Sequence, residues 1–297
     1  MINVSNAHGR ALEYIIVEKL NSSWPGEVSL TSRAVVDQNR DAPLYGNLNT
    51  GLINSYSSCA EKVVEWLYGK YGNKPVDIMV DRLSDQDARR GDVTDICITS
   101  VDENINLSVK NRHLALKHQR PSATAQHCGF KRNSQEDKNF KHSYKSIVES
   151  FIRQAKADYT SASLFRELNA EDPGYVSRNL YRPVCGLVAD FIGDVGMQQE
   201  NAFELFKFLV GSADFYKIVN YEAEVHVYEF ARIAEPTSLT VEQDGDSYVF
   251  LQFSNGWRMS LRLHTASSRI SDSLKFDTQL ANPDELMNVV PRTVLQK

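Results

Sequence analysis

The feature that most constrains the fold of this chain is an alternation of apolar and polar residues across positions 92–110 (DVTDICITSVDENINLSVK). The turn-forming residues 102–104 divide it into two runs, a pattern typical of an antiparallel β-hairpin. Successive side chains of a strand point to opposite faces, so one set of residues faces a core and the other faces outward. The residues predicted to face the core are Ile96, Ile98, Ile105, Leu107 and Val109.

The opposite face of the hairpin carries polar residues of complementary chemistry. Asp95 lies on it in the first run, and Ser108 and Lys110 lie on it in the second. With the turn centred on residues 102–103, Asp95 falls nearly opposite Lys110, with the two Cβ atoms about 5 Å apart in a regular hairpin. An acid and an amine are therefore expected to meet on one face.

A carboxylate beside an amine suits the cleavage of phosphodiesters. That reaction needs a divalent cation to neutralise the phosphate and generate a hydroxide, and a positive group to orient water or stabilise the developing charge. We expect Asp95 to bind the metal and Lys110 to supply the positive group. Mg²⁺ is the expected ion because it accepts one or two carboxylates and keeps several waters. The alternative is a surface ion pair, which contributes little energy.

The rest of the chain alternates between helical and extended patterns. Residues 76–80 are a short buried strand or the end of a helix, and the polar, basic residues 121–142 are predicted to form a loop. The predicted helices are residues 8–21, 57–71, 143–157, 182–194 and 199–211. The predicted strands lie within residues 217–230, 238–243 and 247–264, the last a hairpin that turns on Asn255-Gly256.

This order of elements predicts a mixed α/β (α+β) fold, with a central mixed sheet flanked by helices and a β-rich C-terminal part. We expect residues 1–135 to form a catalytic core. Residues 136–297 are expected to form a helical segment and a C-terminal β-rich part, packed with the core into one globular unit.

Composition excludes several classes of protein. The net charge of −5 argues against a protein that coats nucleic acid without specificity. The four cysteines form no CxxC pair, so neither a zinc site nor a disulfide framework is indicated. A cytoplasmic protein without membrane contact is expected, because there is no long apolar run and no signal-peptide pattern at the start. A small-molecule enzyme finds little support, because the chain has no Gly-rich phosphate loop, GxSxG or HExxH.

Three stretches resemble a known family of proteins. GDVTDICI with LSVKNRHLALKHQRPS, and later WRMSLRLHTASSRISDSLKFD, are similar to the HaeIII-type family of type II restriction endonucleases, within the PD-(D/E)XK nuclease superfamily. The likeness covers residues 8–16, 90–121 and 257–277. It implies a PD-(D/E)XK-like core in which Asp95 is the metal-binding carboxylate, Lys110 is the motif lysine and Glu13 in GRALE is the helical acid.

One position departs from the superfamily pattern. Ser108 stands where a second acidic ligand is expected, and a hydroxyl is a poor substitute for a carboxylate around Mg²⁺. Glu13 or Asp92 can compensate as metal ligands, although Glu13 is otherwise a solvated helix residue and Asp92 a turn residue. The other alternative is a chain that has lost catalysis and only binds DNA.

Candidate DNA contacts follow the hairpin directly. The run from Lys110 to Arg120 has no acid, and its residue types hold phosphates and reach base edges, although such a run is usually a solvated face. Arg112 and Lys117 are predicted to contact the backbone, whereas Asn111, His113 and Gln119 are candidates to approach bases or position the scissile phosphate. The full set of candidates in this run is Asn111, Arg112, His113, Lys117, His118, Gln119 and Arg120.

The C-terminal hairpin offers a second set. Residues 257, 259, 261 and 263 are apolar and alternate with polar residues that are predicted to face outward, among them Arg262. An arginine on a two-stranded ribbon can bridge O6 and N7 of guanine in the major groove. The alternative is an ordinary amphipathic hairpin. The resemblance implies that this region lies near the DNA, and its candidates are Arg262, His264, Ser267, Ser268, Arg269 and Lys275.

The resemblance implies an Mg²⁺-dependent type II restriction endonuclease that cuts both strands of double-stranded DNA at a short, palindromic site. Two-fold symmetry of the site favours a homodimer, and a DNA methyltransferase is the expected functional partner. The alternatives are a PD-(D/E)XK repair or junction nuclease that recognises DNA structure, and a non-catalytic DNA-binding module.

Overall fold

A computed structural model describes residues 4–71, 76–83, 94–101, 103–211, 213–230, 235–286, 288 and 290–297. Asp92 therefore lies outside the described residues. The chain divides into two compact units, and the first comprises residues 1–114, 211–233 and 290–297. The second comprises residues 115–210 and 234–289.

This division differs from the linear one at residue 135, because the chain leaves the first unit and returns to it twice. The central strand of residues 215–220 pairs with the hairpin strand of residues 104–111, and the C-terminal strand pairs at the sheet's edge. Hydrogen bonds between distant segments, rather than position along the chain, define the units.

The first unit is built on a mixed seven-stranded sheet. Its strands pair antiparallel except β1 with β2 and β4 with β6, which are parallel. In spatial order the strands are β1 (Val28–Leu30), β2 (Ile78–Arg82), β3 (Ile96–Thr99), β4 (Asn104–Asn111), β6 (Phe215–Asn220), β7 (Glu224–Phe230) and β12 (Arg292–Gln296).

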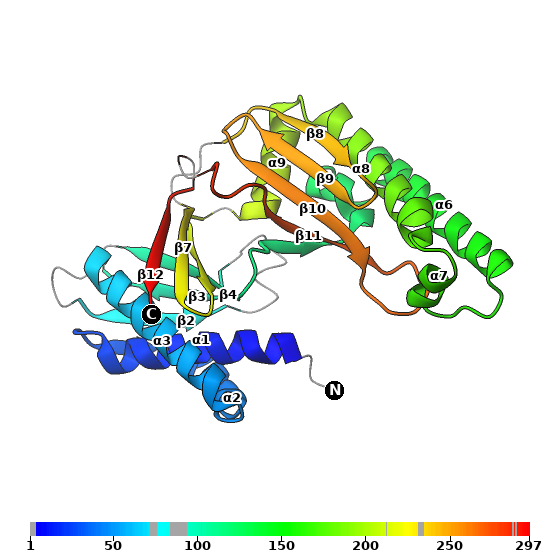
Figure 1. Ribbon diagram of the computed structural model, residues 1–297. Helices are drawn as coiled ribbons and strands as arrows, with labels where there is room; N and C mark the ends of the chain where they lie inside the picture. The colour runs from blue at the N-terminus through cyan, green and yellow to red at the C-terminus, as the bar shows by residue number, and fades with distance from the viewer. Residues whose placement is uncertain are drawn as a thin grey trace. The chain divides into compact units, whose positions relative to one another are not determined.

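Helices cover one face of this sheet. They are α1 (Val4–Ser23), α2 (Ser32–Gly46) and α3 (Thr50–Tyr71), and α1 and α3 lie across the strands (Figure 1). All five apolar hairpin residues predicted to face inward are buried against α1 and α3. This part of the prediction is confirmed. Thr31 begins α2, because its side chain accepts a hydrogen bond from the backbone N–H of Ala34.

The second unit pairs an antiparallel sheet with helices. The strands in spatial order are β5 (Lys117–Gln119), β11 (Leu274–Leu280), β10 (Arg258–Thr265), β9 (Tyr248–Phe253) and β8 (Leu239–Asp244). The helical elements are η1 (Pro121–Ala123), α5 (Thr124–His127), α6 (Gln135–Asp158), α7 (Phe165–Glu171), η2 (Ser177–Tyr181), α8 (Arg182–Val195) and α9 (Gln199–Val210).

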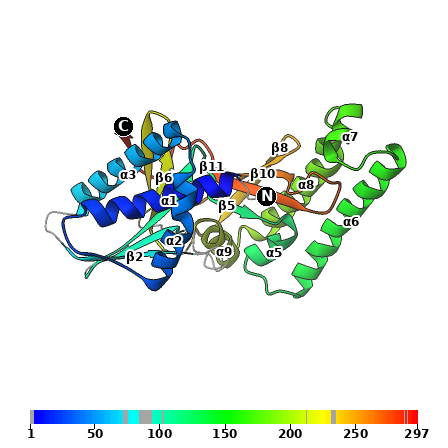
Figure 2. The same ribbon diagram turned by 90° about the horizontal axis from the view of Figure 1, so that it is seen from below.

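Figure 2 shows α5 and α9 on the same side of this five-stranded sheet. The inward residues of β10 are buried as the alternation predicts, since Met259, Leu261 and Leu263 are at most 1% exposed. Ser260 is also buried, although the alternation places it on the outward face. The mixed α/β class is confirmed in the described part of both units.

The loop predicted over residues 121–142 is wrong. Residues 121–127 form η1 and α5, and α6 begins at Gln135, where the side chain of Ser134 accepts a hydrogen bond from the backbone N–H of Asp137. The apolar face of α6 is sparse, with Phe140 and Tyr144 spaced by four residues among charged ones. Tertiary packing of this face, rather than local pattern, defines the helix.

Candidate functional site

Asp95 lies where β3 begins, and its side chain completes the hydrogen bonding of β4. Its Oδ2 accepts hydrogen bonds from the backbone N–H of Val109 at 2.6 Å and from Lys110 Nζ at 3.1 Å. Its own N–H donates to the carbonyl of Leu107. Because Val109 lies beyond the last residue pair of β3 and β4, the carboxylate replaces a strand partner at this point.

The hairpin register differs from the predicted one by two residues. Ile96 pairs with Leu107, so Asp95 lies beside Ser108 rather than Lys110. A slip of two residues leaves every side chain on its predicted face. The contact between Asp95 and Lys110 is therefore made diagonally, by the long lysine side chain.

Ser108 is buried between charged groups. Its Oγ donates to Asp95 Oδ2 at 3.3 Å, and its exposed fraction is 1%. A buried hydroxyl that donates to the carboxylate orients Asp95. It adds no negative charge to the site.

Glu13 extends from α1 and meets a buried arginine. Its Oε2 accepts a hydrogen bond from Arg82 Nη2 at 2.6 Å. Burial, followed by the nearby negative charge of Asp95, raises the pKa of Glu13 to about 7. The alternative of a solvated helix glutamate does not describe this side chain, which is part-buried and electrostatically coupled to Asp95.

Arg82 joins α1 to α2 through the end of β2. Its guanidinium is 2% exposed and also donates to Gln38 Oε1 at 3.1 Å and to Asp41 Oδ2 at 2.9 Å. Asp41 is fully buried, yet hydrogen bonds from Arg40 and Arg10 outweigh the effect of burial and lower its pKa to about 2. The helix that carries Glu13 is thereby fixed by a charged network.

Lys217 was not anticipated from the sequence. It lies next to Ser108 in the parallel pairing of β4 with β6, and its side chain is fully buried. Burial, then the positive charge of Lys110, holds its pKa well below the usual range, while Asp95 opposes this shift. The available signal was a single lysine within an otherwise buried strand, FYKIVN.

The carboxylates of this site fit an open magnesium site rather than a closed cage. Among the residues that the structure describes, no group of three or more His, Cys, Asp or Glu side chains is placed to hold a metal. Mg²⁺ is commonly held by one or two carboxylates together with waters and substrate phosphates. Asp95 and Glu13 are the two carboxylates that would hold the ion: each contributes to the electrostatics of the other, since Asp95 helps burial to raise the pKa of Glu13.

The basic run after Lys110 is divided between the two units. Asn111 donates to the hydroxyl of Tyr56 at 3.0 Å and accepts from Asn220 at 3.1 Å. Arg112 is exposed, with a positive φ of 60° and an ion pair to Glu222 at 3.7 Å. His113 is exposed and lies between β4 and β5. Of these three candidates, Arg112 and His113 are the more accessible to a ligand.

In the second unit, three of the candidates have internal partners. Lys117 Nζ donates to the carbonyl of Phe208 at 2.9 Å and lies 4.0 Å from the centre of its ring. Gln119 is buried beside Thr278, whereas the exposed Arg120 donates to Ser273 Oγ and the Leu274 carbonyl. Their contacts with DNA remain predictions.

The outward face of the five-stranded sheet brings the remaining candidates together. His118, Arg262, His264 and Lys275 lie on its β5, β10 and β11 strands, around the carboxylate of Asp277. Sequence reasoning missed Asp277, although the alternation in SLKFD places it on the same face as Lys275.

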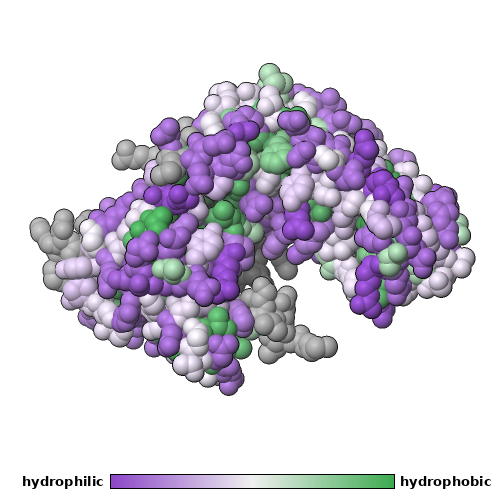
Figure 3. Space-filling model, viewed as in Figure 1, coloured by the Kyte–Doolittle hydropathy of each residue, from purple (hydrophilic) through white to green (hydrophobic). Residues whose placement is uncertain are grey.

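Viewed as in Figure 1, hydrophilic residues cover most of the visible surface, with small hydrophobic spots (Figure 3).

The other C-terminal candidates follow β10. Ser267 Oγ accepts from the backbone N–H of Arg269 at 3.1 Å, and the Ser268 carbonyl accepts from the N–H of Phe165 at the start of α7. Arg269 is exposed and forms an isolated bridge with Leu164. This stretch is therefore fixed to α7 within the second unit.

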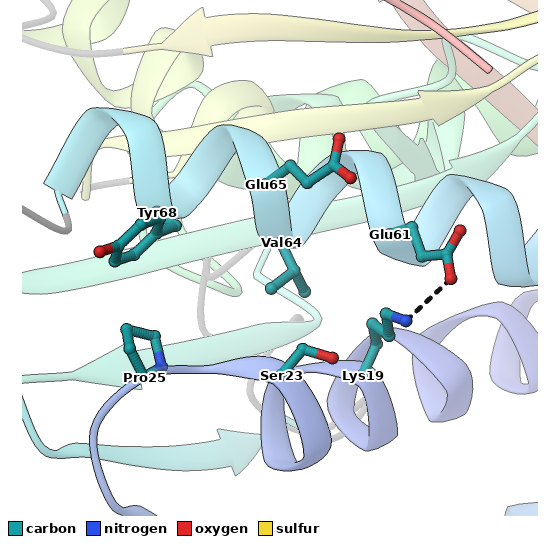
Figure 4. Close-up of a pocket in the computed structure, with 7 residues that line it drawn as sticks. All are labelled: Lys19, Ser23, Pro25, Glu61, Val64, Glu65 and Tyr68. Atoms are coloured by element: carbon teal, nitrogen blue, oxygen red, sulfur yellow. Dashed lines mark hydrogen bonds and ion pairs between the residues drawn. The ribbon is translucent and has the colours of Figure 1, made fainter. Parts of the chain in front are cut away.

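A hollow of about 510 Å³ between the end of α1 and α3 has the wrong charge for a DNA backbone. Its lining includes Glu61 and Glu65, and its one lysine, Lys19, donates to Glu61 Oε1 at 2.8 Å (Figure 4). Two carboxylates against one paired ammonium repel phosphates. The charge of this hollow does not support a role in binding DNA.

All four cysteines are free, and three of them are buried. Within the described residues, no helix is long and apolar enough to cross a membrane.

Comparison with known proteins identifies the class. The profile of the HaeIII restriction endonuclease family matches residues 9–230 and 223–282, and the chain belongs to this family of restriction endonucleases, nucleases that act at specific DNA sites. The chain is also similar to the type II restriction enzyme HaeIII of Haemophilus aegyptius, with 25% identity over an alignment of 344 positions. The alignment covers 99% of this chain and 98% of the relative. No solved structure matches the chain with significance.

Proposed function

We propose that this protein is a type II restriction endonuclease that makes Mg²⁺-dependent double-strand cuts at a short palindromic DNA sequence. The observation that carries the proposal is the Asp95 carboxylate at the start of β3, hydrogen-bonded to Lys110 Nζ and close enough to Glu13 to help raise the pKa of that carboxyl. An acid pair next to an amine is the combination that metal-assisted phosphodiester hydrolysis requires.

Each residue has a distinct part in this proposal. Asp95 and Glu13 would hold the metal, which when bound neutralises the phosphate and lowers the pKa of water. Lys110 donates to Asp95 Oδ2, and in this proposal it supplies the positive charge that orients the attacking water or stabilises the developing negative charge. Ser108 orients Asp95, and Arg82 fixes Glu13.

A palindromic site has two-fold symmetry, and we propose that a homodimer matches it, with each subunit cutting one strand. A DNA methyltransferase that protects the host's own sites is the proposed functional partner. The basic residues of the run after Lys110 and of the outward face of the second unit are the proposed DNA contacts.

The deciding experiment is incubation of the purified protein with several plasmids in Mg²⁺. Discrete fragments whose ends map to one short sequence support the proposal. Smearing, or intact DNA in every plasmid, overturns it. Asp95→Asn, purified in parallel, is the matched control, because the amide keeps the shape of the side chain and excludes a contaminating host nuclease as the source of cleavage.

A second candidate is a non-catalytic DNA-binding module, favoured by the neutral Ser108 at a position where an acid is expected. It predicts specific binding of duplex DNA without product in Mg²⁺. Measuring binding and cleavage on the same duplex separates the two. Competition between a branched and a linear duplex tests the further alternative, a repair or junction nuclease.

A further inference from the structure

A carboxylate between two imidazoles lies on the outward face of the five-stranded sheet. Asp277 of β11 pairs with His118 of β5 in the strand register, and His264 lies diagonally across β10. His118 Nδ1 contacts Asp277 Oδ1, and His264 Nε2 lies 2.9 Å from Asp277 Oδ2. Both rings are therefore oriented by one acid.

The groups that face this cluster are charged and come from three strands. They are Lys275 on β11, Arg262 on β10 and the two histidines themselves; on β5, Lys117 is engaged with Phe208. The row of paired residues that contains Asp277 and Arg262 continues to Tyr248 of β9. The exposed acidic residues of this face, Glu242 and Asp244, lie on β8 at the opposite edge of the sheet. The basic part of the face is therefore formed by β5, β11 and β10.

The contact with Asp277 determines which atom of His118 can bind a ligand. Nδ1 of His118 lies against an oxygen of Asp277, and a carboxylate only accepts hydrogen bonds, so this contact favours the tautomer with the proton on Nδ1. In a neutral imidazole the other nitrogen, Nε2, is then an acceptor. The His118 side chain is 56% exposed, so this acceptor is available to a ligand.

The protonation states agree with this assignment. Burial, together with the charges of Lys275 and His264, lowers the pKa of His118 although Asp277 opposes the shift, so the neutral form predominates at pH 7. Burial alone would raise the pKa of Asp277, but its contacts with His264 and His118 lower it, so the carboxylate is ionised.

We propose that Nε2 of His118 accepts a hydrogen bond from the exocyclic amino group of a DNA base, cytosine N4 or adenine N6, and that Asp277 is the positioning residue that fixes this tautomer. These amino groups are the donors that base pairs present in the major groove. A phosphate offers only acceptors, so a neutral His118 does not bind it. Phosphates are left to Arg262 and Lys275. The proposal rests on the proposed function, because it assumes that the protein binds a specific DNA sequence.

The test is selection of bound sequences from a random duplex library at pH 7.5, with Ca²⁺ in place of Mg²⁺. The wild type is expected to require cytosine or adenine at one symmetric position of the selected sequence. His118→Ala is expected to lose that preference by about tenfold while keeping the preferences at other positions. The matched control is His142→Ala, because His142 is an exposed histidine of α6 outside the cluster.

Asp277→Asn tests the positioning role. An amide presents a donor as well as an acceptor to the imidazole, so it no longer imposes one tautomer. The preference at the same position is expected to fall about tenfold, with the remaining preferences intact. A purely structural role would weaken all positions together. Retention of the full preference in Asp277→Asn overturns the role of Asp277.

The pH dependence supplies an independent readout. We would measure the ratio of affinities for the selected duplex and for the same duplex with the one base pair exchanged. Protonation turns Nε2 into a donor. Because the pKa of His118 is lowered from its ordinary value of about 6.5, the ratio should hold from pH 8 to pH 6.5, fall toward one as the pH drops below 6.5, and stay constant in His118→Ala. A ratio that rises as pH falls overturns the acceptor assignment.

The outcomes distinguish this proposal from the proposed function. If the wild type selects no sequence, both fail. If it selects a sequence and His118→Ala retains every preference, only the role of His118 fails. Because His118 lies exposed on an edge strand, its truncation is expected to leave folding intact, which thermal unfolding checks.

Discussion

Lys217 lies beside Ser108 in the parallel register of β6 and β4, and its side chain is fully buried. The charges of both Lys110 and Asp95 act on its pKa. The neutral serine thus lies between the Asp95 carboxylate and a buried lysine whose pKa is lowered well below its usual range. An acid at position 108 would place a second carboxylate between them. The charge of the candidate site is therefore set by β6 as well as by the hairpin.

Replacing Lys217 with methionine should change how stability depends on pH. Because the folded pKa lies below the unfolded value of about 10.4, folding favours the neutral amine. Its contribution is complete above the unfolded pKa and is lost as pH falls toward the folded pKa. The stability of the wild type relative to Lys217→Met should therefore rise between pH 7 and pH 10, by at most about 1.4 kcal/mol per pH unit.

Urea unfolding at pH 7, 8.5 and 10 measures this difference. Lys62→Met is the matched control, since Lys62 forms only an exposed ion pair with Glu65. A difference between wild type and Lys217→Met that stays flat across these pH values would show that the lysine titrates normally.

Removing the amine of Lys110 should stop cleavage without removing DNA binding. In Lys110→Met the side chain keeps its length but loses the positive charge held against Asp95 Oδ2. We expect cleavage to fall by about 100-fold or more, the usual cost of losing a group that stabilises developing charge. Single-turnover cleavage and gel-shift binding on one duplex measure the two properties. Normal cutting by this variant would exclude the hairpin as the active site.

Ser108→Ala should be far milder. The serine supplies one hydrogen bond of 3.3 Å to Asp95, worth about 1 kcal/mol, and no metal-binding charge. We expect cleavage to fall by at most about tenfold. Titration of the rate with Mg²⁺ tests this role, because loss of a direct ligand would instead abolish activity or shift the Mg²⁺ requirement strongly.

Arg82→Met should destabilise the first unit. It leaves the Glu13 carboxylate without its arginine and removes one of three arginines from Asp41, and breaking one side of a buried ion pair costs about 3–5 kcal/mol. Lys62→Ala, which breaks an exposed pair, should cost less than about 1 kcal/mol. Urea denaturation of the three proteins compares them. Equal stability of Arg82→Met and wild type would contradict a structural role for the network.

Local pattern accounts for much of the fold. The helix predicted from residue 8 is α1, the hairpin is β3 and β4, and the turn at Asn255-Gly256 joins β9 to β10. Short or weakly patterned elements were missed, among them α2, α5 and β5. A three-residue strand such as β5 exists only because β11 pairs with it, so its own residues carry no signal.

The candidate site divides in the same way. Alternation places Asp95 and Lys110 on one face in both the predicted and the observed register, because the two differ by two residues and such a slip preserves the faces. The alternation of the hairpin does not predict the roles of Arg82, Lys217 or Asp277. Each of these acquires its role from a segment distant in sequence.

The sequence by itself determined the hairpin faces, the mixed α/β class and the family likeness, since periodicity and motifs depend on neighbouring residues. The tertiary structure alone decided the register that sets Asp95 beside Ser108, the burial of Lys217 and the ion pair between Glu13 and Arg82. These relationships depend on which strands and helices pack together. The free energy of that packing comes from contacts between residues far apart along the chain.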